Sequence, residues 1–254
     1  MRLLGRLICL LSVLAAPAAS AQNSVIGDLD QHSVSLTTGF SGSQLFIYGS
    51  VIGARQEVPF DVIVTVTGPS EPVTVRKKKR QFGIWINGRG VEVDEAPSFY
   101  AVATSKAFRE TVSYTDDLRY RIGLDQVIRL VDAPAWVENR EEYRRAVIRI
   151  REEQGLYSVL PFAVGMRAND LFAARIKLPA NLVEGDYRAR IFLVQNKQVV
   201  DVFEDKIEVR RAGLGRWIYS AAQDYPAMYG IGAILVALIA GWLASAFFRT
   251  FFPN

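Results

Sequence analysis

The chain has 254 residues, of which 50% are hydrophobic and 11% aromatic, so it is long and apolar enough to bury a sizeable core. Its 30 Lys and Arg residues nearly balance its 26 Asp and Glu residues, which excludes an intrinsically disordered chain and a basic nucleic-acid-binding tail. One Cys and one His leave little material for catalysis by a thiolate or an imidazole, or for a zinc thiolate site.

Residues 1–21 have the pattern of a secretory signal peptide. A basic start precedes an apolar stretch at residues 7–16, and Ala19 and Ala21 are the small residues that a signal peptidase requires. The stretch is far shorter than the roughly 20 residues that cross a bilayer, which favours a cleaved signal over an uncleaved anchor. Cleavage after Ala21 would also remove Cys9, so the mature chain would contain no cysteine.

Residues 28–32 combine two carboxylates with the one histidine of the chain. Alternation along an extended strand would place Asp28, Asp30 and His32 on one face, where they could bind a divalent metal. The other interpretation, which we adopt, is a solvated segment leading into the first strand. We therefore predict no metal and no other cofactor.

Most of the next 180 residues alternate apolar and polar side chains with a period of two, which is typical of half-buried strands. In the segment 187–194, for example, Tyr187, Ala189, Ile191 and Leu193 are expected to face the core. The predicted strands are 32–37, 44–50, 60–67, 72–76, 82–87, 171–178, 187–194 and 199–210, with a hairpin turn at 195–198. The predicted fold is mainly β, an immunoglobulin-like β-sandwich over residues 22–210.

The strongest local charge is a run of five bases: Arg76, Lys77, Lys78, Lys79 and Arg80. An exported protein does not meet nucleic acid, so the run could bind anionic lipid headgroups, a cell-wall polyanion or an acidic partner surface. The alternative is a solvated bend or sheet edge, in which lysines discourage aggregation.

Aromatic residues follow this basic run. Trp85 lies in an alternating segment and is more typical of a core position, whereas Phe99 and Tyr100, which follow Pro97, could rim a groove. The sequence leaves both alternatives open, so Trp85, Phe99 and Tyr100 are candidate groove residues.

The middle of the chain changes period. From residue 139 to 154, apolar residues recur at i, i+3, i+4 and i+7 from Tyr143 onward, which predicts an amphipathic helix that ends at Gly155. A shorter helical pattern covers 117–131. We interpret residues 106–154 as a helical insertion between two halves of one β domain; two small β domains joined by helices are the alternative.

A membrane span is predicted at residues 227–248, because residues 229–248 carry no charge and are long enough to cross about 30 Å of hydrocarbon. An amphipathic juxtamembrane segment precedes it at 211–226 and a short cytoplasmic tail follows at 249–254. With a cleaved signal, the topology is single-pass type I. Arg210, Arg211 and Arg216 on the exported side do not fit the positive-inside rule, but a translocated amino terminus leaves a single span no other orientation.

Small residues recur every four positions within this span, at Ala233, Ala237, Gly241 and Ser245. Such a stripe permits close approach of another helix, so we expect packing against a second copy or against another membrane protein.

The sequence contains no HExxH, GxSxG, P-loop or dinucleotide-binding motif, and we predict that the protein is not an enzyme and has no catalytic residue.

Several segments together resemble a known family: GSQLFIYGS, DVIVTVTGP, VRKKKRQFGIWIN, APSFYAVATS, EGDYRARIFL and YGIGAILVALIAGWLASAFFR. They are similar to the alphaproteobacterial transmembrane proteins, single-span envelope proteins of unassigned activity. The resemblance implies a location in the bacterial inner membrane with most of the chain in the periplasm, and it supplies no catalytic residue.

The expected function is that of a membrane-anchored periplasmic interaction or accessory module of an inner-membrane complex or transporter, without enzymatic activity. The alternative is a periplasmic ligand-binding or sensing module for a small molecule or cell-wall component. Neither hypothesis involves nucleic acid.

Overall fold

The structure, a computed structural model, describes residues 23–53, 59–129, 136–137, 139–167, 170–212, 222–223 and 225–251. The predicted signal peptide and most of the predicted juxtamembrane segment lie outside these residues.

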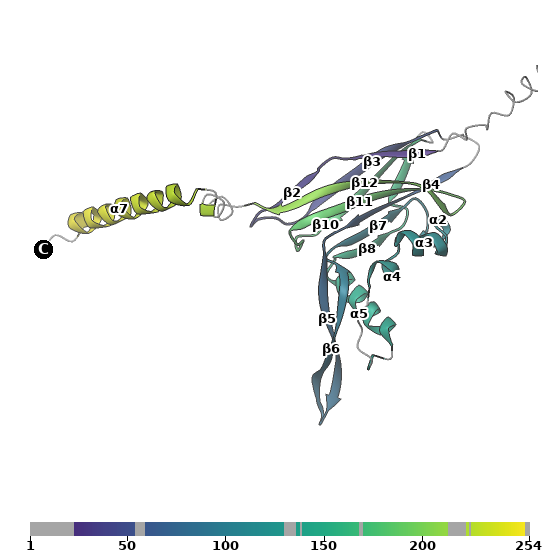
Figure 1. Cartoon of the computed structure of the whole chain (residues 1–254), viewed down its shortest axis with the longest axis horizontal. Helices are drawn as coiled ribbons and strands as arrows, with labels where there is room; N and C mark the ends of the chain where they lie inside the picture. Colours follow the sequence, from purple (N-terminus) through teal and green to yellow (C-terminus); the bar gives the residue numbers. More distant parts are fainter. Residues whose placement is uncertain are drawn as a thin grey trace, which may run out of the picture.

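Two sheets and a separate hairpin account for the strands (Figure 1). A four-stranded sheet has the order β1-β3-β10-β9 and a six-stranded sheet the order β2-β12-β11-β4-β7-β8, while β5 pairs with β6. The strands are β1 Ser24–Leu29, β2 Ser33–Leu36, β3 Ser43–Ile52, β4 Phe60–Thr67, β5 Ser70–Gln81, β6 Ile84–Pro97, β7 Tyr100–Thr104, β8 Tyr157–Leu160, β9 Val164–Arg167, β10 Leu171–Leu178, β11 Gly185–Gln195 and β12 Gln198–Arg211.

Both halves of the chain build the same sheets. In the six-stranded sheet the early strand β4 pairs antiparallel with the late strand β11, and β2 pairs parallel with β12. In the four-stranded sheet β3 lies between β1 and β10. Strands from both halves of the chain therefore pair within the same two sheets, which together we call the β body.

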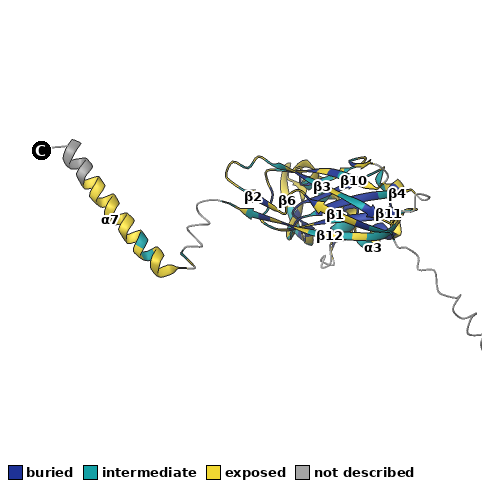
Figure 2. Ribbon diagram, turned by 90° about the horizontal axis from the view of Figure 1, so that it is seen from above, coloured by how far each residue is buried: buried dark blue, intermediate teal, exposed yellow. Residues whose placement is uncertain are grey.

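The core lies between the two sheets, as the buried residues in Figure 2 show. Ile47 of β3 and Ile176 of β10 are buried in the same cluster as Val64 of β4 and Ile191 of β11. The alternation predicted for β11 is confirmed, because Tyr187, Ala189, Ile191 and Leu193 are all buried. Burial of such apolar surface contributes roughly 25 cal/mol per Å² and is the main force that holds the sheets together.

In the described part of the chain between β7 and β8 there are four short to medium helices. They are α2 Phe108–Thr111, α3 Tyr114–Tyr120, α4 Leu124–Val127 and α5 Arg140–Glu153. Tyr120 at the end of α3 contacts Phe192 of β11 with the ring centroids 6.0 Å apart. Because this ring lies on the outer face of the six-stranded sheet, the inner strands β4 and β11 are buried on both faces, and Ile63 and Phe192 are as inaccessible as the residues of the core face.

The last helix, α7, comprises Pro226–Phe251. Its window at Pro226–Ser245 has a mean hydropathy of 2.0 and no part of it is buried in the protein. Figure 2 shows α7 as almost wholly exposed and separate from the β body. A helix this apolar and this exposed is what a lipid environment requires, and it matches the predicted span.

Candidate functional site

The β5–β6 hairpin, which we call the arm, extends away from the β body (Figure 1). Its two strands pair only with each other among the described strands. At the base of the arm Val75 and Val93 belong to the buried core of the body and Val91 is also buried, whereas the residues from Arg76 through Asn87 are all exposed. The predicted strands at 72–76 and 82–87 are thus shorter than the observed ones, and the basic run lies within β5 rather than in a bend.

The turn of the arm has an unusual first residue. Phe82 and Gly83 both have positive φ, 50° and 85°, as the two central residues of a type I′ hairpin turn do. Asn-Gly is the sequence that such turns prefer, and a bulky L-residue in this conformation is an outlier. Phe82 is also 98% exposed, so nothing in the described protein compensates for its position.

Apolar side chains surround the tip on both faces of the arm. Ile84 pairs with Gln81 and lies on one face, and Trp85 pairs with Arg80 and lies on the other. Ile84 and Trp85 are 64% and 68% exposed. Trp85 is therefore a surface residue, not the core residue that its alternating segment suggested.

The arm is strongly cationic. Between Val75 and Val91 the chain contains the five-base run and Arg89, and no acidic residue. Lys77 forms an ion pair of 2.6 Å with Glu142 of α5, and this carboxylate raises the pKa of Lys77. Arg89 lies 6.0 Å from the Trp136 ring. The other four bases of the run form no ion pair within the described part of the chain.

A groove separates the arm from α5. Its volume is about 870 Å³, and it is lined by Val75, Arg76 and Lys77 on the arm side and by Tyr143 and Ile150 on the helix side. Asn139 begins α5 by accepting a hydrogen bond from the backbone N–H of Glu142, so the helix start that fixes one wall of the groove is encoded locally.

Phe99 and Tyr100 do not belong to this groove. Their exposed fractions are 1% and 0%, because β7 lies in the six-stranded sheet beneath the helices. The Tyr100 hydroxyl donates to the carbonyl of Ile122 at 2.5 Å, and burial raises the pKa of Tyr100. Phe99 is therefore a core residue and does not rim a groove. Tyr100 is equally inaccessible, but it is among the residues that line a separate polar groove of about 510 Å³ together with Pro97 and Arg190.

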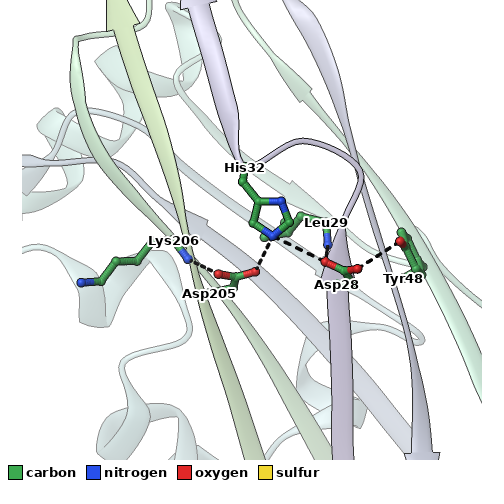
Figure 3. Close-up of polar contacts among 6 residues, drawn as sticks. All are labelled: Asp28, Leu29, His32, Tyr48, Asp205 and Lys206. Carbon is green, nitrogen blue, oxygen red and sulfur yellow. Dashed lines mark hydrogen bonds and ion pairs between the residues drawn. The ribbon is translucent and has the colours of Figure 1, made fainter.

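A second group of polar residues gathers where β1 and β2 approach β12 (Figure 3). His32 Nε2 lies 3.2 Å from Asp205 Oδ2 and 3.5 Å from Asp28 Oδ1. Tyr48 donates to Asp28 Oδ2 at 3.3 Å, and the charge of Asp28 raises the pKa of Tyr48. The backbone N–H of Lys206 holds the other oxygen of Asp205 at 2.7 Å.

One atom from each of Asp28, His32 and Asp205 falls within a group whose members are at most 4.8 Å apart. This spacing suits a small divalent cation, and it equally suits a surface ion pair of a protonated imidazole. Asp30, the third residue of the predicted cluster, instead accepts a hydrogen bond from the backbone N–H of Phe46 at 2.9 Å. Asp205 replaces Asp30 as the third member of the cluster. No local sequence pattern could have indicated Asp205, because it lies 173 residues from His32 in the chain.

The outer face of the four-stranded sheet carries a shallow apolar groove of about 830 Å³. Ile26, Phe46, Tyr48, Phe162 and Leu171 line it, and the Asp28 carboxylate lies at its edge. Its volume is within the range of small-molecule sites, although it is an open surface and not an enclosed cavity.

The small residues of the predicted helix-packing stripe, Ala233, Ala237, Gly241 and Ser245, all lie in α7 and are exposed. A Cβ at Gly241 would meet no atom within 4 Å, so the face is open to another helix or to lipid.

Comparisons with known proteins add one clear match. The model of the family described as "Putative transmembrane protein (Alph_Pro_TM)" matches residues 24–250. No curated protein matches the sequence. A crystal structure of the sporulation control protein Spo0M from Bacillus subtilis is similar at 9% identity and a TM-score of 0.29, over 80% of this chain and 55% of that chain. So low a score supports no inference about fold or function.

Proposed function

The chain belongs to this alphaproteobacterial family of transmembrane proteins, and from that premise we propose that it is a non-enzymatic interaction or accessory module of an inner-membrane complex or transporter. In this proposal α7 anchors the protein as a type I span, and the β body, an immunoglobulin-like sandwich, lies in the periplasm. The arm is its binding element.

The arm is the observation that supports this proposal. The hairpin leaves the body and exposes Phe82, Ile84 and Trp85 to water. This exposure is unfavourable, and no burial within the described residues compensates for it. Contiguous exposed apolar surface rimmed by charge is typical of an interaction site. The cations of the run add long-range attraction toward an acidic surface.

The most buried carboxylates of the described residues make contacts within the fold. The two best buried carboxylates, Asp116 and Asp117, accept hydrogen bonds from the backbone N–H groups of Val199 and Gly123. Asp117 also pairs with Arg109 at 3.0 Å. These contacts fasten α3 to its surroundings, which favours a structural role for both residues.

Copurification from native membranes tests the proposal. Full-length protein is compared with a variant in which Ile84 and Trp85 are replaced by Ser, and with a control in which exposed Tyr114 on α3 is replaced by Ser. A membrane protein that is retained by the wild type and the control, and lost from the arm variant, supports the proposal. A set of bound proteins that the arm variant retains unchanged would contradict it.

The groove on the outer face of the four-stranded sheet favours a second candidate function, the binding of a small molecule or cell-wall component. Thermal melting of the full chain in detergent, with soluble peptidoglycan fragments as the probe, tests it. Stabilisation that is lost on replacing Phe162 and Leu171 by Ser would support this function, and an unchanged melting temperature would exclude those fragments as ligands.

A further inference from the structure

We propose that the tip of the arm inserts into the anionic lipid leaflet of the same membrane that holds α7. This inference rests on the proposed function, in which the arm is the binding element, and it names the chemistry that the arm recognises.

The distribution of apolar side chains indicates lipid. Phe82 occupies the end of the hairpin, Ile84 one face and Trp85 the other, so apolar surface surrounds the tip. A protein partner docks against one face or one edge of a two-stranded ribbon, whereas a lipid leaflet surrounds whatever enters it. Tryptophan is also the residue that concentrates at the boundary between headgroups and acyl chains.

Basic side chains of β5 lie on both faces of the arm behind this apolar tip. Lys79 pairs with Ile86 on the face of Ile84, while Lys78 and Arg80 lie on the face of Trp85. At about 3.3 Å per residue, these three bases lie roughly 7 to 13 Å along the strand from Phe82. That is the depth at which phosphate groups lie when an apolar element enters an interface by about 5–10 Å. No acidic residue lies between Val75 and Val91, and Glu142 of α5 pairs with Lys77 and not with these three bases.

The turn supports the same conclusion. Phe82 combines a positive φ with full exposure, and each of these features is unfavourable in water. Insertion into lipid would remove the cost of exposing the Phe82 ring to water. Because this ring lies at the extreme end of the hairpin, it would enter the lipid first.

The chain is long enough for the arm to reach its own membrane. Fourteen residues, 212–225, separate β12 from α7, and such a segment spans at most about 50 Å. The exposed part of the arm, from Arg76 to Phe82, has a length of roughly 20 Å at 3.3 Å per residue. Both lengths are compatible with contact between the tip and the leaflet while α7 remains in place.

Quenching of Trp85 by brominated lipid tests this proposal on the full chain in nanodiscs. The chain has 4 Trp residues, so the Trp85 signal is obtained as the difference between the wild type and Trp85→Phe, which keeps the tip apolar. Discs contain either zwitterionic lipid alone or a mixture with anionic phosphatidylglycerol, with bromine on the acyl chains.

We expect quenching of the Trp85 signal in anionic discs and its loss on combined charge reversal of Lys78, Lys79 and Arg80. Loss of each positive charge weakens partitioning about fivefold, and reversal adds repulsion, so insertion should weaken by more than about 100-fold. The matched control reverses three exposed bases on the β body: Arg167, Lys177 and Lys206. It should leave the quenching unchanged, and circular dichroism confirms that each variant is folded.

Absence of Trp85 quenching in anionic discs overturns the proposal, as does equal loss of quenching in the control. If Trp85 is not quenched but the arm variant still loses a membrane protein on copurification, the arm binds an acidic protein and the proposed function stands without the lipid contact. If both experiments are negative, both inferences fall.

Discussion

Replacing Phe82 by Asn should stabilise the hairpin of the arm and weaken its binding. In the structure Phe82 has φ 50° and lies in the first central position of a type I′ turn. A left-handed conformation costs an ordinary L-residue roughly 1–2 kcal/mol, and Asn is among the residues that tolerate it best. Because the side chain is 98% exposed, its removal sacrifices almost no burial within the protein.

The expected gain is therefore about 1 kcal/mol in the free energy of opening the hairpin, which corresponds to about fivefold slower amide exchange near its tip. Hydrogen–deuterium exchange of the full chain in detergent measures this on peptides that contain Gln81 and Ile84. Global unfolding is a poor readout, since a two-stranded hairpin can open while the β body stays folded.

Phe162→Asn is the matched control. Phe162 is also exposed and also has a positive φ, 59°, but it lies beside the four-stranded sheet. The control should leave exchange in the arm unchanged. Unchanged or faster exchange in the arm of Phe82→Asn would refute the reasoning that the turn carries a conformational cost.

Three further predictions follow from buried groups and from α7. Asp117→Ala removes a carboxylate that is 1% exposed and leaves Arg109 and the backbone N–H of Gly123 without their acceptor. The free energy of unfolding, measured by urea denaturation, should therefore fall by about 2–4 kcal/mol. A fall below about 1 kcal/mol would contradict a structural role for Asp117. Burial raises the pKa of Tyr100, Tyr157 and Tyr187, so the folded state keeps these protons while the unfolded state releases them above a pH of about 10. Stability should be unaffected below that pH, and above it should fall by about 1.4 kcal/mol per pH unit for each tyrosine that stays protonated in the folded state. Denaturation at pH 9 to 11 measures this, and a flat profile would disagree. Ala237→Ile should weaken any association through the small-residue face of α7, measured by cross-linking in detergent, and an unchanged cross-linked species would exclude that face.

The sequence predicted best those strands that have one buried and one solvated face. In β11, alternation is clear because Tyr187 and Ile191 face the core while Asp186 and Arg188 face water. Phe99 and the strand β7 that follows it have no such pattern, because all of these residues are buried, between the other sheet on one side and the helices on the other. Its aromatic residues therefore suggested a surface groove.

The arm could be predicted only in part. Its composition identified a cationic segment, but strands that pack against no core carry no alternation of burial, so the length of β5 and β6 and the exposure of Trp85 could not be obtained from the pattern. The contact of His32 with Asp205 depends on the pairing of β2 with β12, a long-range feature that no local signal encodes.

Site-specific photo-cross-linking in native membranes tests most directly the central claim that the arm tip is the contacting surface. A benzophenone amino acid replaces Phe82 in one variant and Tyr114, an exposed aromatic residue on α3, in the other. We predict that the probe at position 82 gives lipid adducts, detected by mass spectrometry, and that the probe at position 114 does not. Equal adduct yields at the two positions, or none at position 82, would contradict the account.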